Sequence, residues 1–188
     1  MGKKEDIFSA AYDLFSTKGF KSVGVSDITS LAGISVGSFY NYYASKEELF
    51  IDICTAENKK AKDFIIHSLD TSSAPIDMIQ QFFLLNMKTI KESRILSEWY
   101  GENMGEKLRK QFQSQTLPSI LTLQEFIHQQ MALWRSQNIL REDISDEEIL
   151  SIYYALVYLD VHTDRMTSAN FAKAIEWLSK FTAAGIMK

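Results

Sequence analysis

Residues 32–50 read AGISVGSFYNYYASKEELF, and this stretch decides the fold class. Two glycines precede four aromatic side chains that fall within the five positions from Phe39 to Tyr43. Ser35 stands at a position where a helix begins, and a serine hydroxyl there can accept a hydrogen bond from a backbone N–H of the first turn. The pattern predicts a tight turn at AGIS followed by a short helix over residues 36–43.

Helical periodicity continues on both sides of this stretch. Toward the N-terminus, one apolar stripe ends at Gly19 and a second, over residues 25–32, ends at Gly33. Toward the C-terminus, Ser45 and Glu48 have the spacing of a capping box, which predicts a longer helix that reaches about residue 69. The turn and the helices on either side of it therefore form an expected helix-turn-helix, with residues 36–43 as its second helix.

The remaining sequence is helical in pattern as well. Pro75 follows the linker at residues 70–74 and suits a first helical position, and Ser145 with Glu148 forms a second capping box. The pattern contains no convincing strand and no internal repeat. The expected fold class is all-α with about nine helices.

Composition limits the class of protein. The 188 residues are 46% hydrophobic and 23% charged, with only 8 Gly and 2 Pro, as in ordinary globular proteins. The single cysteine, Cys54, cannot form an internal disulfide, which suits a reducing compartment. The run at residues 149–159 is too short to cross a bilayer, so a cytoplasmic protein is expected. A net charge of −4 argues against nucleic-acid binding over the whole surface.

Any contact with DNA must therefore be local. In a helix-turn-helix the second helix enters the major groove, and small or hydroxylated residues at its start allow a close approach. Residues 28–46 contain no acidic side chain, although residues 1–50 hold five lysines against six acids. Phe39 and Tyr43 are four residues apart and are expected to pack inward, with Tyr40 and Tyr42 on other faces.

Residues 3–50 resemble the DNA-binding domain of the TetR family of bacterial transcriptional regulators. The resemblance rests on Phe15, Gly19-Phe20, Ile28 and the run AGISVGSFYNYYASKEEL. It implies an all-helical homodimer with a helix-turn-helix DNA-binding domain at residues 1–46 and a helical ligand-binding and dimerisation domain at residues 47–188. Matched residue by residue, it implies DNA contacts at Ser26, Ser35, Val36, Gly37, Ser38, Tyr40, Asn41, Tyr42 and Lys46.

Two positions depart from the family pattern. Gly24 stands where members usually carry a threonine that caps the helix and contacts phosphate, and Ser26 is the expected substitute. Tyr42 replaces a common histidine, which keeps a hydrogen-bond donor without a charge change near neutral pH.

The resemblance also implies an effector pocket among the central helices. The candidate residues are Phe83, Met87, Trp99, Tyr100, Met104, Phe126, Met131 and Trp134. Such a set fits either a plain apolar core or the wall of a pocket. Arg94 and Glu98 flank it and fit either solvent or a polar group of the effector. Because few charges interrupt the set, the expected effector is small and mostly hydrophobic.

The two C-terminal helices carry more apolar surface than one core requires, which indicates self-pairing. The expected dimer contacts are Ile149, Ile152, Tyr153, Leu156, Val157, Phe171, Ile175 and Leu178. The expected function is that of a repressor that binds a pseudo-palindromic operator as a homodimer and is released by its effector, without a metal or cofactor. The alternative is a helical-bundle ligand-binding module or an enzyme without DNA function. A di-iron bundle needs two Glu-x-x-His pairs, and only Glu125 and His128 have that spacing.

Overall fold

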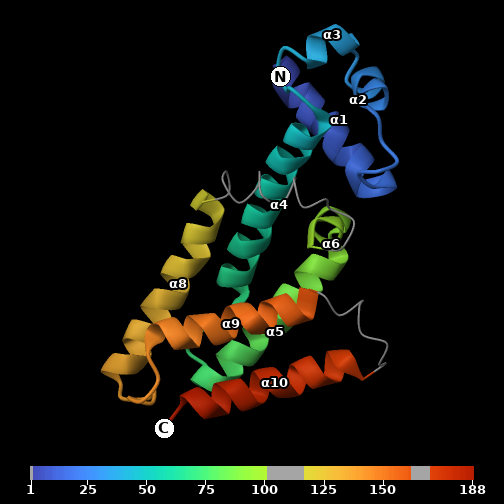
Figure 1. Ribbon diagram of the computed structural model, residues 1–188. Helices are drawn as coiled ribbons and strands as arrows, with labels where there is room; N and C mark the ends of the chain where they lie inside the picture. Colours follow the sequence, from blue (N-terminus) through green and yellow to red (C-terminus); the bar gives the residue numbers. More distant parts are fainter. Residues whose placement is uncertain (1, 101–116, 162–169) are drawn as a thin grey trace. The chain divides into compact units, whose positions relative to one another are not determined.

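The computed structural model describes residues 2–100, 117–161 and 170–188, and within these ranges the chain is helical (Figure 1). The sole β feature in those ranges is an isolated antiparallel bridge between Leu140 and Met187. No described helix is long and apolar enough to span a membrane. The expected all-α fold is confirmed. The helices are α1 (Lys3–Lys18), α2 (Val25–Leu31), α3 (Val36–Phe39), α4 (Lys46–Ser68), α5 (Pro75–Glu92), α6 (Arg94–Tyr100), α8 (Leu117–Ser136), α9 (Asp146–Val161) and α10 (Phe171–Ile186).

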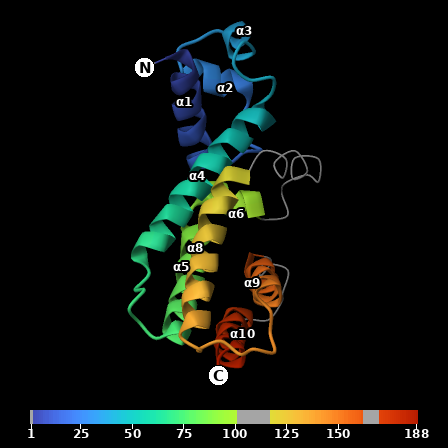
Figure 2. The same ribbon diagram turned by 90° about the vertical axis from the view of Figure 1, so that its left-hand side faces the viewer.

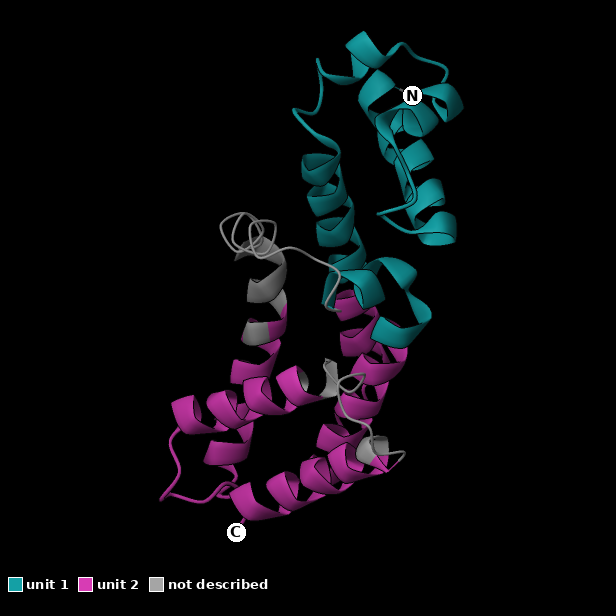
Figure 3. Cartoon of the chain, turned by 45° about the vertical axis from the view of Figure 1, so that its right-hand side comes forward, with its two compact units in different colours: residues 1–60, 90–119 teal, residues 61–89, 120–188 magenta. Residues whose placement is uncertain are grey.

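The chain forms two compact units (Figure 3). The first unit comprises residues 1–60 and 90–119, and the second comprises residues 61–89 and 120–188. The boundaries fall inside α4, α5 and α8, so each of these helices contributes to both units. This grouping follows contacts in space rather than the functional division expected at residue 46.

The core of the first unit is aromatic at its centre. The ring centroids of Phe15 and Phe50 are 5.1 Å apart, with the rings edge to face. The ring centroids of Phe20 and Phe50 are 4.6 Å apart. Phe39 and Tyr43 are buried in the same core, as the sequence predicts. Cys54, on α4, is fully buried there. Burial raises the pKa of its thiol, and the carboxylates of Glu57 and Glu98 raise it further.

The helix starts follow the local sequence signals. Glu48 N donates to Ser45 Oγ at 3.1 Å, and the Glu48 carboxylate reaches back to the backbone N–H of Ala44 at 2.6 Å. Ser145 and Glu148 form the second predicted capping box, with both reciprocal hydrogen bonds present. Short-range capping rules therefore locate these helix starts within one residue.

The helix predicted over residues 36–43 is shorter than expected. Its α-helical part, α3, ends at Phe39, and residues 40–42 form a turn. Asn41 N donates to Ser38 O and Tyr42 N donates to Phe39 O, at 3.3 and 2.9 Å, which are three-residue steps. These tighter bonds end the α-helix early, because an α-helix requires four-residue steps.

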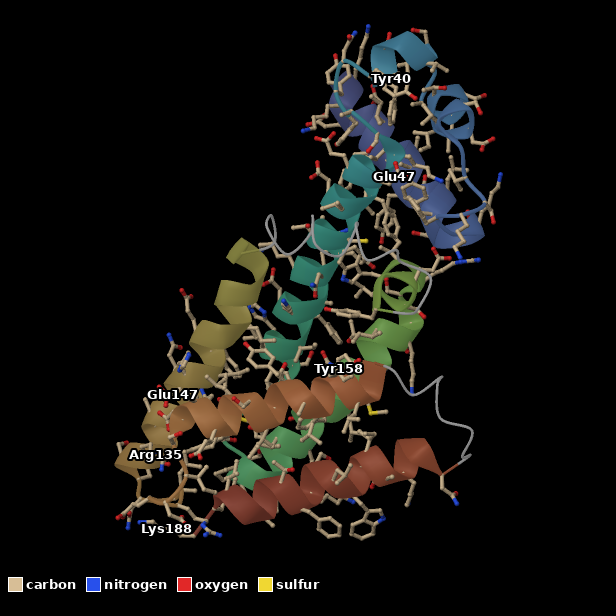
Figure 4. The ribbon with its side chains drawn as sticks, in the orientation of Figure 1. Tyr40, Glu47, Arg135, Glu147, Tyr158 and Lys188 are labelled. Carbon is tan, nitrogen blue, oxygen red and sulfur yellow. The ribbon has the colours of Figure 1, made fainter. Side chains whose placement is uncertain are left out.

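The second unit contains α9, α10, most of α5 and α8, and the end of α4. Helices α9 and α10 pack side by side (Figure 2). Arg135, near the end of α8, fixes the loop that leads to α9 (Figure 4). Its guanidinium donates to the carbonyls of Arg141 and Ile144 and to Asp146 Oδ1 at 2.9 and 2.8 Å. One side chain thus holds three points of the connection in place.

Candidate nucleic-acid interface and apolar cavity

The start of α3 presents small and hydroxylated side chains. Ser35 is the N-cap, and its Oγ accepts a hydrogen bond from the Ser38 backbone N–H at 3.2 Å. The two serine hydroxyl oxygens lie 2.9 Å apart. Ser35, Val36 and Gly37 are all exposed, and Ser38 is half-buried. The helix therefore begins with its own cap satisfied and with little bulk on its outer side.

Two glycines in this segment serve different needs. Gly33 has a φ of 66°, a left-handed conformation that a side chain disfavours. Gly37 lies inside α3, and a Cβ built on it would meet no atom nearer than Ser35 Oγ at 4.0 Å. The fold itself therefore accepts a side chain at Gly37. What the glycine at that position provides is room for a partner to approach the helix.

The aromatic run divides into buried and exposed members. Phe39 and Tyr43 are almost completely buried, whereas Tyr40 is 55% exposed and Tyr42 is 39% exposed (Tyr40 is labelled in Figure 4). Asn41 is also exposed. Two phenol hydroxyls and one amide thus stand at the end of α3, where they can donate hydrogen bonds to a phosphate or a base edge.

Tyr43 holds the exposed segment to the rest of the first unit. Burial raises its pKa to about 12, and the negative charge of Asp52 adds to the effect. The ammonium of Lys4 lies 5.1 Å from the centroid of the Tyr43 ring. This contact brings the N-terminal start of α1 beside the aromatic segment. It adds Lys4 as a candidate cation of the interface, which spacing in the sequence alone does not indicate.

The start of α2 has the predicted glycine cap. Gly24 N donates to Asp27 Oδ2 at 2.7 Å, which is one half of a capping box, whereas glycine has no hydroxyl to accept an N–H of the first turn as a threonine would. Ser26 is exposed in the first turn. Its hydroxyl therefore remains a candidate for the phosphate contact that Gly24 cannot make.

Lys46 has a role that the sequence analysis missed. Its ammonium donates to the carbonyl oxygens of Phe20 and Val23 at 2.9 and 2.7 Å, and it lies 4.1 Å from the centroid of the Phe20 ring. An ammonium has three N–H donors, so two of them are used within the unit. Lys46 fastens the connection between α1 and α2 to the start of α4, and it is not simply a free cation that faces DNA.

Arg94 and Glu98 on α6 fasten the same connection from another side. The Arg94 guanidinium donates to the carbonyls of Thr17 and Lys18 at 2.7 and 3.2 Å, where α1 ends. Glu98 Oε2 accepts the backbone N–H of Phe20 at 2.7 Å. Arg94 is exposed, as expected for a residue that faces solvent, and the pair also satisfies backbone groups at the end of α1, which the sequence did not indicate.

Glu57 makes a third such connection. Its two carboxylate oxygens accept hydrogen bonds from the Tyr12 hydroxyl at 3.0 Å and from the Ser93 hydroxyl at 2.9 Å. These residues come from α4, α1 and the segment before α6. The helices that carry the exposed segment are therefore joined to α6 by charged and polar side chains as well as by the shared apolar core.

The second unit contains an apolar cavity. The space that the centre of a water-sized molecule can occupy is about 80 Å³, and the whole hollow, including space open to solvent, is about 650 Å³. Its walls come from the ends of α4 and α5 and from α8, α9 and α10. The lining residues are Leu69, Met78, Ile79, Phe82, Phe83, Phe126, Ile127, Gln130, Met131, Trp134, Ile149, Leu150, Tyr153, Leu156, Thr182 and Ile186.

The residues suggested for an effector pocket separate in the structure. Four of them line the cavity: Phe83, Phe126, Met131 and Trp134. Trp99 belongs to the core of the first unit, Tyr100 packs against that core, and neither is part of the lining. Met87 is not part of the lining, and Met104 lies outside the described residues. The sequence pattern could not separate them, because both cores draw on the same residue types.

Helices α9 and α10 carry exposed apolar side chains in the second unit. They are Ile152, Tyr154, Tyr158, Trp177, Leu178 and Phe181, and Phe181 is 63% exposed. Of the suggested dimer contacts, Ile152 and Leu178 are among these exposed side chains, while Ile149, Leu156 and Ile175 are buried within the unit and Tyr153 lines the cavity. The suggested dimer contacts stay a prediction, because these helices are apolar on more than one face. The side chains of Val157 and Phe171 lie outside the described part.

Residues 7–53 match the family model described as "Bacterial regulatory proteins, tetR family". An uncharacterized HTH-type transcriptional regulator, YxaF of Bacillus subtilis, is 35% identical over 80 residues, which are 42% of each chain. The HTH-type transcriptional repressor KstR2 of Mycolicibacterium smegmatis is 25% identical over 47% of this chain and 43% of its own length. The matches thus span less than half the length of these curated relatives.

The fold is similar to solved structures over nearly the whole chain. Thermus thermophilus FadR, a transcriptional repressor solved in complex with lauroyl-CoA, aligns with a TM-score of 0.68 at 24% identity, covering 97% of this chain and 94% of that one. At this identity the likeness concerns the fold alone. The motif, the family match over residues 7–53 and the helical fold agree, and in that part the chain is similar to the TetR family of bacterial regulatory proteins.

Proposed function

We propose that this chain is a transcriptional repressor that binds a pseudo-palindromic operator as a homodimer and releases it when a small, mostly hydrophobic effector binds. The observation that carries the proposal is Gly37, a helical glycine that no contact within the unit requires, at the exposed start of a helix-turn-helix. A bare helix surface is useful where another molecule must come close, as in the major groove.

The DNA surface in this proposal is the start of α3 and the turn that follows it. Ser35, Val36, Gly37 and Ser38 approach the base edges, and Tyr40, Asn41 and Tyr42 donate hydrogen bonds to phosphates or bases. The hydroxyl of Ser26 contributes one phosphate contact from α2. No acidic side chain occurs in residues 28–46, so nothing in that segment repels the phosphates.

Lys46 contributes to this surface mainly by holding it in shape. Two of its donors are used on the carbonyls of Phe20 and Val23, which leaves one for a phosphate. Lys4, beside Tyr43, adds a second positive charge near the surface. With so few cations, binding depends on close fit more than on charge. The salt dependence of operator binding is therefore expected to be shallow.

Dimerisation in this proposal uses the exposed apolar side chains of α9 and α10. Pairing them in two copies about a two-fold axis buries aromatic side chains that otherwise contact water. A two-fold dimer also matches the symmetry of a pseudo-palindromic site. Sedimentation is expected to give about 43 kDa, which is twice the 21.5 kDa of one chain.

The effector site in this proposal is the apolar cavity, which falls within the ligand-binding region at residues 47–188. DNA binding is assigned to residues 1–46, and a cytoplasmic location follows from the proposed role. The lauroyl-CoA bound in the Thermus thermophilus FadR structure joins an apolar acyl chain to a charged coenzyme A group, so it is a ligand to test against smaller apolar ones. Effector and operator must weaken each other's binding by the same factor if they are coupled.

Selection of bound genomic fragments tests the DNA function. The purified chain is incubated with sheared genomic DNA of its source, and the retained fragments are sequenced. One or a few fragments that contain a shared inverted repeat are expected. A Gly37→Trp variant, which fills the bare surface, serves as the control and should retain none of them. Equal retention by both proteins, or no enrichment at all, would leave a ligand-binding module without DNA function as the better reading.

A further inference from the structure

Gln130 on α8 is a polar side chain in the wall of an apolar cavity. Of the sixteen lining residues only Gln130, Trp134, Tyr153 and Thr182 carry a polar group in the side chain, and none is charged. The oxygen Oε1 of Gln130 is buried, and it has no hydrogen-bond partner among the described residues. This atom sets Gln130 apart within the lining.

An unpaired buried amide oxygen reduces stability. A polar group that has left water without finding a partner loses about 1 to 3 kcal/mol. Native proteins rarely keep such groups, and those that remain often serve a binding or catalytic role. A leucine or methionine at this position would complete the apolar wall without that loss. The glutamine is therefore better explained by a partner that arrives with a ligand.

Water is a poor candidate for that partner. A buried water needs two to four polar groups around it, and cavities with apolar walls stay dry. Here most side chains that could surround a water at Gln130 are aliphatic, aromatic or methionine. The same walls suit the apolar body of a small organic molecule.

We propose that the effector carries a neutral hydrogen-bond donor, a hydroxyl or an N–H, that binds Gln130 Oε1 while its apolar body fills the cavity. The inference rests on the proposed effector site and specifies its ligand class. A carboxylate does not fit, because Oε1 is itself an acceptor and the described lining offers no cation to offset the burial of a charge. A group with acceptors alone, such as an ether or an ester, leaves Oε1 unpaired.

Two isomeric probes test the donor requirement. 1-Octanol and heptyl methyl ether have the same atoms, but the alcohol alone can donate a hydrogen bond. Calorimetric titration of the full chain is expected to show about tenfold tighter binding of the alcohol. Octanoate is expected to bind more weakly than either. Equal affinities for the alcohol and the ether would overturn the proposal.

Two variants assign the preference to one atom. Gln130→Leu removes the amide, and Gln129→Leu makes the same change at the neighbouring exposed position. The alcohol preference is expected to disappear in Gln130→Leu, which binds the ether more tightly than the parent, and to persist in Gln129→Leu. Unliganded Gln130→Leu is also expected to melt at a higher temperature than the parent. A preference that survives in Gln130→Leu, or a lower melting temperature, contradicts the role of Oε1.

Operator release is measured separately, so the two proposals can fail independently. If 1-octanol binds with the Gln130-dependent preference but leaves operator affinity unchanged, the donor inference stands and effector-induced release is rejected. If operator binding is found but alcohol and ether bind without discrimination, the donor inference is rejected and the repressor function stands. If none of the three probes binds, the donor site at this cavity is rejected.

Discussion

The connection after α1 in the first unit and the cavity wall in the second unit differ in how their polar side chains are paired. In the first unit, the charged ends of Lys46, Arg94 and Glu98 bind backbone groups of the connection after α1. In the second unit, the amide oxygen of Gln130 lies in an apolar wall without such a partner. A surface that must match DNA gains from being fixed before binding. A ligand site can leave one group to be satisfied by the ligand.

The two units also differ in how burial shifts the pKa of a titratable side chain. Burial lowers the pKa of Lys62, in the second unit, to about 8. Burial raises the pKa of Cys54, in the first unit, above its ordinary value of 9.0. Stability therefore responds to alkaline pH with opposite sign at the two positions.

The largest expected effect comes from Gly19→Ala, which breaks the fixed connection. Gly19 has φ 83° and ψ 160°, a region that glycine alone occupies readily, and a Cβ there would overlap Glu98 Oε1. The free energy of unfolding is expected to fall by about 2 to 3 kcal/mol. Thermal and urea unfolding measure it. Gly37→Ala is the matched control, and an equal loss in both variants would contradict the difference between the two glycines.

A smaller loss is expected when Lys46 is replaced by methionine, which keeps the length of the side chain but not its charge. Two charge-assisted hydrogen bonds and a contact with the Phe20 ring disappear, at a cost of about 2 kcal/mol of stability. Urea unfolding without DNA is the measurement, with the exposed Lys3→Met as the control. If Lys46→Met is as stable as the parent and only loses operator affinity, then Lys46 contacts phosphate and does not stabilise the connection between α1 and α2.

Gly37→Ala is expected to separate binding from stability. An added methyl group clashes with nothing in the unit, and alanine favours helix, so stability should stay the same or rise slightly. Operator affinity should fall about fivefold, or about 1 kcal/mol, because the methyl group holds the helix away from the groove. A gel-shift titration on a selected operator gives the affinity. Unchanged affinity would mean that the start of α3 does not meet the bases.

The last expected effect is a pH dependence of stability that differs between the units. Lys62 has a folded pKa of about 8 against 10.5 in the unfolded chain, so between these values the unfolded chain holds more protons and stability rises with pH. At Cys54 the folded pKa is raised, so its contribution falls as pH rises above 9.0. Urea unfolding of the parent and of Lys62→Met at pH 7.5, 8.5 and 9.5 isolates the lysine. The stability of the parent relative to the variant should increase along this series, and a constant difference would rule the effect out.

What sequence reasoning could predict was local. Capping at Ser35, Ser45 and Ser145 follows from residues three positions apart, and the structure has the bonds that these spacings indicate. Hydrogen bonds between segments that are far apart in the chain could not be predicted from the sequence. Glu98 meets the backbone N–H of a residue 78 positions earlier, and no periodicity encodes that pairing.

The apolar stripes predicted the helices, but they did not predict which neighbour each apolar residue contacts. Ile149, Leu156 and Ile175 were assigned to a dimer face because helices with two apolar faces do not reveal which face the neighbouring helix covers. Gln130 is absent from the predicted pocket residues because a single glutamine on an amphipathic helix is typical of a surface position. Its position in a cavity wall depends on where the ends of four other helices lie.

The labelling rate of Cys54 can measure how often the core of the first unit opens. It is the only cysteine in the sequence, it is fully buried, and its raised pKa keeps it as the unreactive thiol. A thiol reagent can therefore label the chain only while the core around α1, α4 and α6 is transiently open. The labelling rate gives the frequency of this opening. Measuring it with and without operator DNA shows whether DNA changes that frequency. A second cysteine introduced on the surface could be labelled selectively beside it.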